Sequence, residues 1–456
     1  MATQEQTSYE FDSIEIQSSR LGKPVEINRI VTDLEIFEHI QKPYLTARMM
    51  VVDDSNFYQD ADFQGTETVV IKIRSTEADS IQIEKTFIIN EVEKQQKIQD
   101  NAQVILFHLV EDIYYLSSLI NVNRHYIGSP RDIIERIARF ELGKKVSGGL
   151  NASQNMRVIV PNLNPIDAMQ WIINRASTNK GYPFYLYSQL VGNDLVMNDL
   201  GSLLTKVSMN AGKDIKFTAS ATKTQNSMNL KVQRRAIKNH TFGSSENLLQ
   251  IIRDGLLSSS YEVIDTLTEG TKKFTFNSRD DLFKKLVLDD ILSKEQPNPP
   301  VNYDEVINDK ELKKYTPGYS TLIGGSMAFR DSAEGINPFK YNEWTNSYNE
   351  TKNAAAYKLR AIQSSMDAML TKNPLAINVN GIEFLKGDNN KTIGNNIDVV
   401  FMVTHNDAAD QTDREDKKKS GKYLIYSARH MFKKSVDVYD MSLGLVKIGN
   451  LRRTET

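Results

Sequence analysis

Short runs of alternating apolar and polar residues recur near both ends of this 456-residue chain. In Thr68–Arg74, Val69 and Ile71 share one face while Lys72 points the other way. A period of two residues is the repeat of a half-buried strand, and short strands separated by polar turns favour a compact antiparallel barrel or sandwich. We therefore predict strands in the region from Tyr9 to Glu111, at Tyr44–Val52, Thr68–Arg74, Ile81–Val92 and Val104–Val110.

The middle of the chain changes to helical signals. Ser129-Pro130 and Asn164-Pro165 each place a capping side chain before a proline at the first helical position, with an acid two residues later. Apolar stripes with helical spacing follow both, and Gly143 is a plausible stop for the first helix. A strand is predicted between the helices at Arg157–Val160, and a hairpin after them at Tyr182–Leu190 and Asp194–Asn198, turning at Gly192-Asn193. Residues 116–205 therefore read as an α/β module.

The C-terminal segment returns to strands. Ile397, Val399 and Phe401 alternate with polar or outward positions, and Lys422–Phe432 with Val436–Lys447 forms a long predicted hairpin. Alternation also marks Ser227–Ile237, where Met228, Leu230 and Val232 face one way. The two strand-rich ends of the chain are candidates for structurally related units.

The region between these strands has a mixed pattern. Residues 245–292 combine helical and strand signals, and Ser293–Ser320 is proline-rich and charged, which is typical of a linker. A helix is predicted at Trp344–Leu370, where apolar residues recur at helical spacing, and Asn373-Pro374 ends it.

Composition excludes several classes of function. The chain has no cysteine, which rules out disulfide scaffolds, thiolate metal sites and a thiol nucleophile. Lysine plus arginine number 56 against 58 acids, so a net charge of −2 gives no global attraction to nucleic acid or anionic membrane. The first 13 residues lack the basic and apolar regions of a signal peptide, and no apolar run reaches transmembrane length. We expect a protein made in a reducing cytoplasm, without membrane insertion.

Residues with catalytic or ligand-binding chemistry do not form a recognisable pattern. No zinc-protease, phosphate-loop, dinucleotide or hydrolase-elbow motif is present. The six histidines are scattered singly, so packed or solvated side chains are favoured over metal ligands; they are His39, His108, His125, His240, His405 and His430. We predict no catalytic, cofactor-binding or metal-binding residues.

Two charged clusters have a functional and a simpler interpretation. The acids at Asp407, Asp410, Asp413, Glu415 and Asp416 suggest a calcium loop, but the ligand spacing is missing and three lysines follow, so a solvated hairpin tip is favoured. A basic cluster suggests phosphate contacts, but the polar face of one strand is favoured; it contains Lys231, Arg234, Arg235 and Lys238.

Several segments, in order along most of the chain, resemble the central hub proteins of phage baseplates. Pro43–Arg74 resembles the N-terminal barrel of that family, with a strand, an Asp-centred turn and a Gly-x-Glu before an apolar strand. The remaining similar segments are those of the α/β module, of a strand pair where the hub chain turns back, and of the last hairpin; they are Tyr126–Gly143, Val158–Ala176, Gly181–Leu204, Asp254–Asn277 and Gly421–Ile448. Residues 293–375 depart from the family pattern.

The resemblance implies an α+β fold with two antiparallel β-barrel, tube-like domains and inserted α/β modules. The expected divisions are a first barrel at 8–115, the α/β module at 116–205, a second barrel in two parts at 206–245 and 376–450, and a mixed insertion with linker and helix at 246–375. It also implies a non-enzymatic hub without cofactors that forms a ring, usually a trimer, and adapts a sixfold tail tube to a threefold central spike.

The resemblance further implies the partners and location of the protein. The expected contacts are other copies of the chain, the spike protein, the tail tube or tube-initiator protein, baseplate wedge proteins and a tape-measure protein, with DNA passing through the lumen without specific binding. The location would be the virion tail baseplate, assembled in the host cytoplasm. Two alternatives remain open: a tail-associated cell-wall-degrading enzyme with its catalytic module in 246–375, and a spike component of a related contractile injection system.

Overall fold

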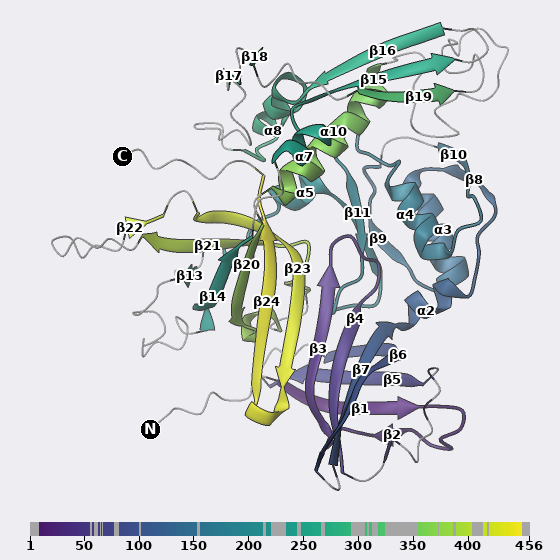
Figure 1. The fold of residues 1–456 in the computed structure, drawn as a ribbon, viewed down its shortest axis with the longest axis vertical. Coiled ribbons are helices and arrows are strands. Elements are labelled where there is room, and N and C mark those ends of the chain that lie inside the picture. Colours follow the sequence, from purple (N-terminus) through teal and green to yellow (C-terminus); the bar gives the residue numbers. More distant parts are fainter. Residues whose placement is uncertain are drawn as a thin grey trace.

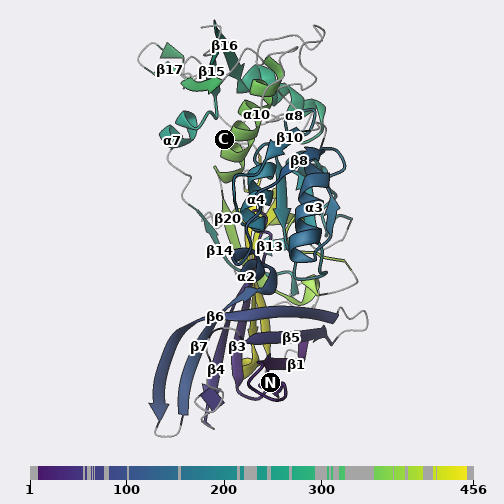
Figure 2. The same cartoon turned by 90° about the vertical axis from the view of Figure 1, so that its right-hand side faces the viewer.

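Antiparallel strands make up most of the structure, a computed structural model. It describes residues 9–54, 57–58, 63, 65, 67–76, 82–99, 102–152, 156–212, 216–219, 234–243, 248–265, 270–292, 306–307, 310–311, 318–323, 354–372, 374–385, 389–403, 414–416 and 419–448. The fold is α+β and mainly β. Along the long axis, the N-terminal strands lie at one end, the α/β module in the middle and residues 248–371 at the other end (Figure 2).

The N-terminal region consists of strands, as predicted. They are β1 (Tyr9–Gln17), β2 (Val25–Glu26), β3 (Val31–His39), β4 (Thr46–Asp53), β5 (Thr68–Ser75), β6 (Gln82–Gln99) and β7 (Ala102–Glu111). Their order across the sheet is β3-β4-β7-β6-β5-β1-β2, and all neighbours are antiparallel. The four strands predicted here are confirmed, except that β6 runs seven residues beyond Val92 to Gln99. This extension pairs with β7 alone and its described side chains are exposed, so it shows no alternation.

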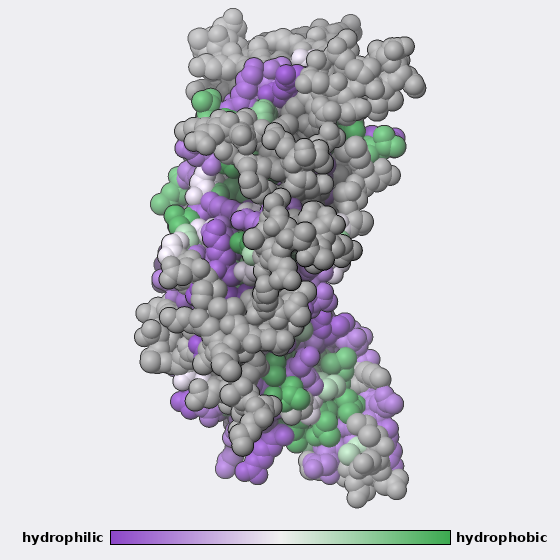
Figure 3. Space-filling model, turned by 90° about the vertical axis from the view of Figure 1, so that its left-hand side faces the viewer, coloured by the Kyte–Doolittle hydropathy of each residue, from purple (hydrophilic) through white to green (hydrophobic). Residues whose placement is uncertain are grey.

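One face of these strands is buried and the other is only partly polar. Met50 pairs with Leu106 and Val52 pairs with Val104 on the outer face, where all four side chains are half-buried. Figure 3 shows hydrophobic side chains gathered over the N-terminal strands, at the lower end of that view. An outer sheet face with this character is suited to contact with another protein surface.

The middle region combines helices with short strands, and many of its buried residues form a hydrophobic core separate from the main one. Its elements are α2 (Asp112–Ser118), β8 (His125–Gly128), α3 (Pro130–Leu142), β9 (Val146–Gly148), β10 (Met156–Ile159), α4 (Pro165–Ile173), β11 (Phe184–Tyr187), β12 (Leu195–Asp199) and α5 (Leu200–Thr205). The helix starts are confirmed, because the side chains of Ser129 and Asn164 each accept a hydrogen bond from the backbone N–H three residues on. Gly143 ends α3 at a φ of 66°, a left-handed conformation that favours glycine.

The second group of strands combines the C-terminal strands with β13 and β14 from the middle of the chain. They are β13 (Phe217–Ala219), β14 (Ile237–Phe242), β20 (Leu375–Asn380), β21 (Asn396–Val403), β22 (Arg414–Glu415), β23 (Gly421–Lys433) and β24 (Val438–Val446), with short 3-10 turns at Ile382–Phe384 and Lys434–Val436. The predicted strand at Ile397–Val403 and the long final hairpin are confirmed. The predicted alternation at 227–233 lies outside the described residues.

The two halves of the β structure have the same strand order. The path β3-β4-β7-β6-β5-β1 of the first half corresponds to β14-β20-β24-β23-β21-β13 of the second. Strand β23 also pairs with β3, so the described strands of both halves form one 14-stranded sheet (Figure 1). In the second half, a bridge between Thr218 and Ala236 leads from β13 back to the start of β14.

The described residues between 248 and 371 form the outer segment of the molecule. It contains α7 (Leu248–Arg253), β15 (Ser258–Asp265), β16 (Gly270–Asn277), the π-helical turn η1 (Ser278–Phe283), α8 (Lys284–Leu288), β17 (Val306–Ile307), β18 (Lys310–Glu311), β19 (Gly318–Ile323) and α10 (Ala354–Thr371). The predicted linker at Ser293–Ser320 was wrong where it is described: β17 and β18 pair with each other, and residues 318–320 belong to β19, which pairs in parallel with β15. The predicted helix is confirmed as α10, and its expected first turns at 344–353 lie outside the described residues.

A buried polar cluster lies where the two halves and the middle module meet. Glu38 on β3 is fully buried; its Oε2 lies 2.9 Å from His430 Nε2, and its Oε1 accepts a hydrogen bond from the Leu190 backbone N–H at 2.5 Å. The other ring nitrogen of His430 lies 2.8 Å from the Tyr439 hydroxyl. Because a buried carboxyl group needs partners, this cluster fixes β3, β23, β24 and the loop after β11 relative to one another.

We expect Glu38→Ala to destabilise the protein by about 3 kcal/mol, because His430 and the Leu190 N–H would remain buried without their partner. Urea unfolding followed by far-UV circular dichroism measures this. The matched control is Glu35→Gln on the same strand, which removes a 2.5 Å ion pair to the half-exposed Arg429. That substitution should cost less than about 1 kcal/mol. Equal losses in the two variants would contradict the importance of the cluster.

Candidate functional site

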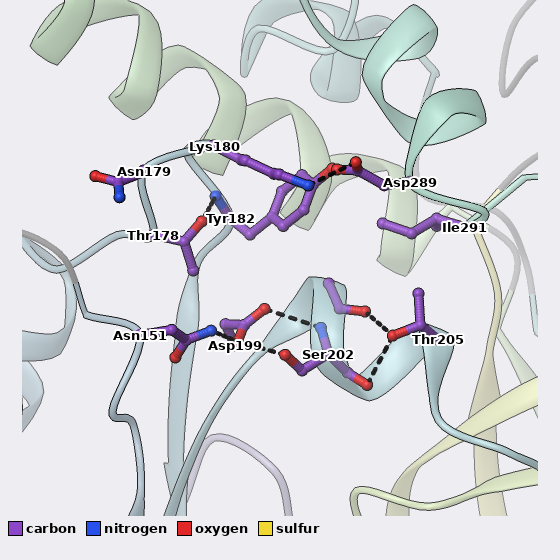
Figure 4. A pocket seen from close by; sticks show the side chains of 11 residues that line it. Asn151, Thr178, Asn179, Lys180, Tyr182, Asp199, Ser202, Thr205, Asp289 and Ile291 are labelled. Atoms are coloured by element: carbon purple, nitrogen blue, oxygen red, sulfur yellow. Dashed lines mark hydrogen bonds and ion pairs between the residues drawn. The ribbon is translucent and has the colours of Figure 1, made fainter.

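The outer segment docks on the α/β module through a polar seam. A cavity of about 390 Å³ lies in this seam, lined from the module by Thr178, Lys180 and Tyr182, and from the outer segment by Asp289 and Ile291. Asn151, Asp199 and α5 close its other side (Figure 4). This cavity brings several ionisable groups together, so we considered it first as a functional site.

Asp199 is held by the local fold at the start of α5. It is the N-cap residue of that helix, and its side chain accepts hydrogen bonds from the Ser202 N–H at 2.8 Å and the Ser202 hydroxyl at 2.7 Å. The side-chain amide of Asn151 donates to it as well. Both carboxyl oxygens are therefore engaged in capping, which is a structural role.

Asp289 links the two sides of the seam. Its carboxyl group accepts hydrogen bonds from Lys180 Nζ at 2.6 Å and from the Tyr182 hydroxyl. Burial opposes its ionisation, but these two hydrogen bonds outweigh burial and hold the pKa of Asp289 below its ordinary value. The pKa of Tyr182 is raised, first by burial and then by its hydrogen bond to Asp289. Tyr182 is thus a donor with its proton firmly bound, not a base.

A second Tyr–Asp pair joins the same two parts of the molecule. The Tyr185 hydroxyl on β11 donates to Asp367 on α10 at 2.5 Å, beside a cavity of about 240 Å³ between α4 and α10. Burial raises the pKa of Asp367 to about 6, and the hydrogen bond from Tyr185 offsets part of that effect. In the same cavity wall, Gln170 Oε1 is buried without a hydrogen-bond partner.

Close backbone approach completes the seam. Gly181 has a φ of 92°, and a Cβ atom there would lie 3.1 Å from the Ile362 side chain. The Gln363 side-chain amide donates to the Ala176 carbonyl. The combination of two Tyr–Asp pairs, an ion pair and tight packing describes a docking joint. Every carboxyl group named in it accepts hydrogen bonds from neighbouring side chains, which is the arrangement expected of a structural contact.

The sequence-predicted histidines are not brought together. His430 is fully buried against Glu38 and Tyr439, and His39 stacks edge-on against Tyr426, where burial lowers its pKa to about 4. His108 is half-buried on β7, His125 and His240 are exposed, and His405 lies outside the described residues. Among the residues that the structure describes, no group of three or more histidines and acids is placed to hold a metal ion.

Two of the described residues of the basic cluster form ion pairs with acids of the same chain. Arg235 pairs with Glu383 at 3.1 Å, and Lys238 on β14 pairs with Asp440 at 2.7 Å, so both cations are bound to acids of the same chain. Because β14 begins at Ile237, the expected strand position is confirmed for Lys238 and was wrong for Arg234 and Arg235, which precede the strand. Lys231 is outside the described residues.

The acidic cluster is described only in part. Asp407, Asp410 and Asp413 lie outside the described residues. Glu415 belongs to β22, and Asp416 accepts a hydrogen bond from the Lys419 N–H at 3.2 Å.

Within the described part of the chain, no helix is long and apolar enough to cross a membrane.

Sequence reasoning missed the groups that hold remote parts of the chain together, in the buried cluster around Glu38 and in the joint. Glu38 and His430 are 392 positions apart, and Tyr185 and Asp367 are 182 apart, so no local pattern connects them. A local signal existed for Asp199: an acid directly before a helical stretch, three residues before Ser202, is typical of a helix N-cap.

The fold is similar to that of two solved tail proteins. A tail protein from Neisseria meningitidis MC58 aligns with a TM-score of 0.52 at 12% sequence identity, over 97% of this chain and 98% of that protein. The 43 kDa tail protein of prophage MuSo2 from Shewanella oneidensis aligns with a TM-score of 0.50 at 10% identity, over 95% of this chain and 98% of that protein. No family model and no curated protein matches the sequence. The chain therefore has the fold of phage tail proteins, which agrees with the resemblance in the sequence.

We expect the seam to be sensitive to pH through Asp367. Its folded-state pKa of about 6 lies above the ordinary value of 3.8, so the native protein holds a proton that the unfolded chain has released between these values. Stability should fall as the pH rises through this window, by up to about 3 kcal/mol. Asp367→Asn keeps an acceptor for Tyr185 and removes the titration, so the variant should match the wild type near pH 4 and exceed it at pH 7. Urea midpoints measured from pH 4 to pH 7 check this; a difference that does not change with pH would contradict it.

Proposed function

We propose that the protein is a structural baseplate hub of a phage tail, which forms a ring, trimeric in the simplest arrangement, between the sixfold tail tube and the threefold central spike. The observation that carries this proposal is the repeated strand order of the two halves, joined edge to edge through β23 and β3. The fold shared with two tail proteins supports a tail location.

The repeat supports two barrel-like domains in each copy. The second half comes closest to a closed barrel, because its pairings run from β13 through β21, β23, β24 and β20 to β14 and return through the Thr218–Ala236 bridge. We assign 8–115 to the first barrel and 206–245 with 376–450 to the second. Residues 116–205 and 246–375 are then peripheral modules, consistent with the separate core of the first of them.

This arrangement resolves a symmetry mismatch. Two similar barrels in each of three copies give six similar units around one axis, which is a surface that a sixfold tube can contact. The peripheral modules differ from one another, so they keep the threefold character that a trimeric spike requires. The hub acts by positioning its neighbours, and no catalytic step is assigned to it.

The partners follow from this position. The proposal places other copies of the chain at the sides, the tube or tube-initiator and tape-measure proteins on one face, the spike on the other and wedge proteins at the periphery. DNA passes through the lumen without specific binding, and a chain with net charge −2 provides no overall attraction for phosphates. Assembly takes place in the host cytoplasm, and the absence of cysteine suits its reducing conditions.

We expect the purified chain to form a concentration-dependent complex of three times its 51.8 kDa mass. Sedimentation velocity over a wide concentration range measures the mass, and electron microscopy of the assembled particle shows whether threefold density lies between tube and spike. A protein that stays monomeric at high concentration in the presence of spike and tube proteins would overturn the proposal.

The enzymatic alternative has its own test. We expect no release of soluble fragments from purified peptidoglycan, because the ionisable groups of the seam are engaged in structural hydrogen bonds. Turnover that is abolished by a single carboxyl substitution would replace the hub assignment with a cell-wall-degrading enzyme.

A further inference from the structure

The two halves match in more than strand order. In the first half, the register of β6 against β7 shifts between Ile89 and Glu91. In the second half, the register of the corresponding strand β23 against β24 shifts between Ile425 and Ser427. Each shift is a bulge near the middle of a long strand, and bulges are positional features that can be used to align repeats.

Once this bulge is aligned, the hydrogen-bond registers determine which residue of each central strand in the first half corresponds to which residue in the second. When Ile89 is placed on Ile425, each neighbouring strand is fixed by its own register with the next. Continuing across the sheet through β7 and β4, and through β24 and β20, places Ile36 of β3 on Phe242 of β14.

A second bulge then coincides without further adjustment. The register of β3 against β4 shifts between Val31 and Asp33. The register of β14 against β20 shifts between Ile237 and Asn239, which are the residues that the alignment places on Val31 and Asp33. Agreement of two independent bulges shows that the central strands of the two halves share one register, except that β6 has two further shifts, between Val92 and Lys94 and between Lys97 and Gln99, that β23 lacks.

Burial follows the same alignment. Buried side chains fall on buried side chains in three pairs of strands: Ala47, Met49 and Val51 on Leu375, Ile377 and Val379; Ile105, Phe107 and Leu109 on Met441, Leu443 and Leu445; Val69, Ile71 and Ile73 on Ile397, Val399 and Phe401. The equivalence ends at the outermost strands, because β1 is antiparallel to β5 whereas β13 is parallel to β21.

The equivalent edges are used differently in the two halves. The outer part of β23, residues 427–433, pairs with β3 of the same chain. The equivalent outer part of β6, residues 91–96, pairs with β7 on one side, and no described strand covers its other side. Likewise β14, the equivalent of β3, pairs with β20 only, and no described strand covers its other side beyond Ile237. Among the described strands, one copy therefore leaves one edge of each kind without a partner.

We propose that these two open edges pair between copies: β14 of one copy adds in antiparallel orientation to residues 91–96 of β6 in the next, reproducing between copies the β23–β3 contact within each copy. This inference rests on the proposed ring and identifies the strands that close it. Because the two edges are different surfaces, the contact is head-to-tail, and repetition of a head-to-tail contact closes into a ring when its rotation allows.

The internal contact also predicts the register of the new one. Met431 of β23 stands opposite Glu35 of β3. Gln96 is the equivalent of Met431, because their partners in β7 and β24 are equivalent residues. Thr241 is the equivalent of Glu35. Gln96 of one copy is therefore expected opposite Thr241 of the next.

The surfaces beside both edges suit such a contact. Lys238, Asn239, His240 and Thr241 are all exposed although they form a strand, and their contacts are with the same chain: Lys238 pairs with Asp440, and the His240 ring lies against Phe401. On the partner side, the half-buried outer stripe formed by β4 and β7 adjoins the open part of β6, since Val104 of that stripe pairs with Gln96. Edge pairing would satisfy the backbone groups of both strands, and the neighbouring copy would shield the stripe.

Disulfide trapping tests this contact in a chain with no cysteine of its own. Opposed residues of an antiparallel pair are close enough for a disulfide, so Gln96→Cys with Thr241→Cys in one chain should convert the monomer band to a ladder ending at the subunit number of the ring. The matched control is Thr86→Cys with Thr241→Cys, because Thr86 lies on the part of β6 that β5 already covers. That control should remain monomeric on a non-reducing gel.

The outcomes separate this inference from the ring itself. If wild-type protein forms the ring but the Gln96–Thr241 pair does not cross-link, and amide exchange at 91–96 and 239–242 is not slowed in the ring, the contact is wrong and the ring stands. If Gln96→Cys alone forms a covalent dimer, two β6 edges pair with each other and the head-to-tail contact is overturned. A monomer without cross-links at every concentration overturns both proposals.

Discussion

The pairing of β23 with β3 is the contact on which the architecture depends. It joins residues 427–433 to residues 33–39 and so converts two separate strand systems into one sheet. The register is fixed by chemistry as well as by backbone hydrogen bonds. A shift of one residue would turn Glu38 and His430 to the outer face and bring charged outer residues such as Glu35 and Arg429 to the buried face. A buried carboxyl group is expensive without partners, so only one register satisfies it.

The α/β module is tied to the same place by a second buried charge. Lys85 on β6 is almost fully buried, donates to the Gly192 carbonyl at 2.6 Å and lies 3.9 Å from Glu111. Burial lowers the pKa of Lys85, and the neighbouring Glu111 acts against this shift. The hairpin turn at Gly192 therefore contacts the first half through Lys85 and through Leu190 on Glu38. These two contacts explain how a module with its own core keeps one orientation on the sheet.

How much could be predicted from the sequence depended on the distance between interacting residues. The caps at Ser129 and Asn164, the stop at Gly143 and the final hairpin rest on contacts within a few residues, so local chemistry was sufficient. The parallel addition of β19 to β15 and the Tyr185–Asp367 pair rest on contacts between remote segments. The entropy of closing such loops is compensated only by the whole fold, and a single sequence carries no local signal for it.

The extension of β6 shows how an edge can be kept available without causing aggregation. Its outer part carries Glu91, Glu93, Gln95 and Gln96 and is interrupted by repeated register shifts against β7. Charges and bulges on an edge strand discourage indiscriminate pairing. The equivalent part of β23 instead carries Ala428, His430 and Phe432 facing the core, because its partner is always present in the same chain. The two repeats therefore differ where one edge is paired within the chain and the other has no partner among the described strands. In the proposed ring, this difference separates a contact made on folding from one made on assembly.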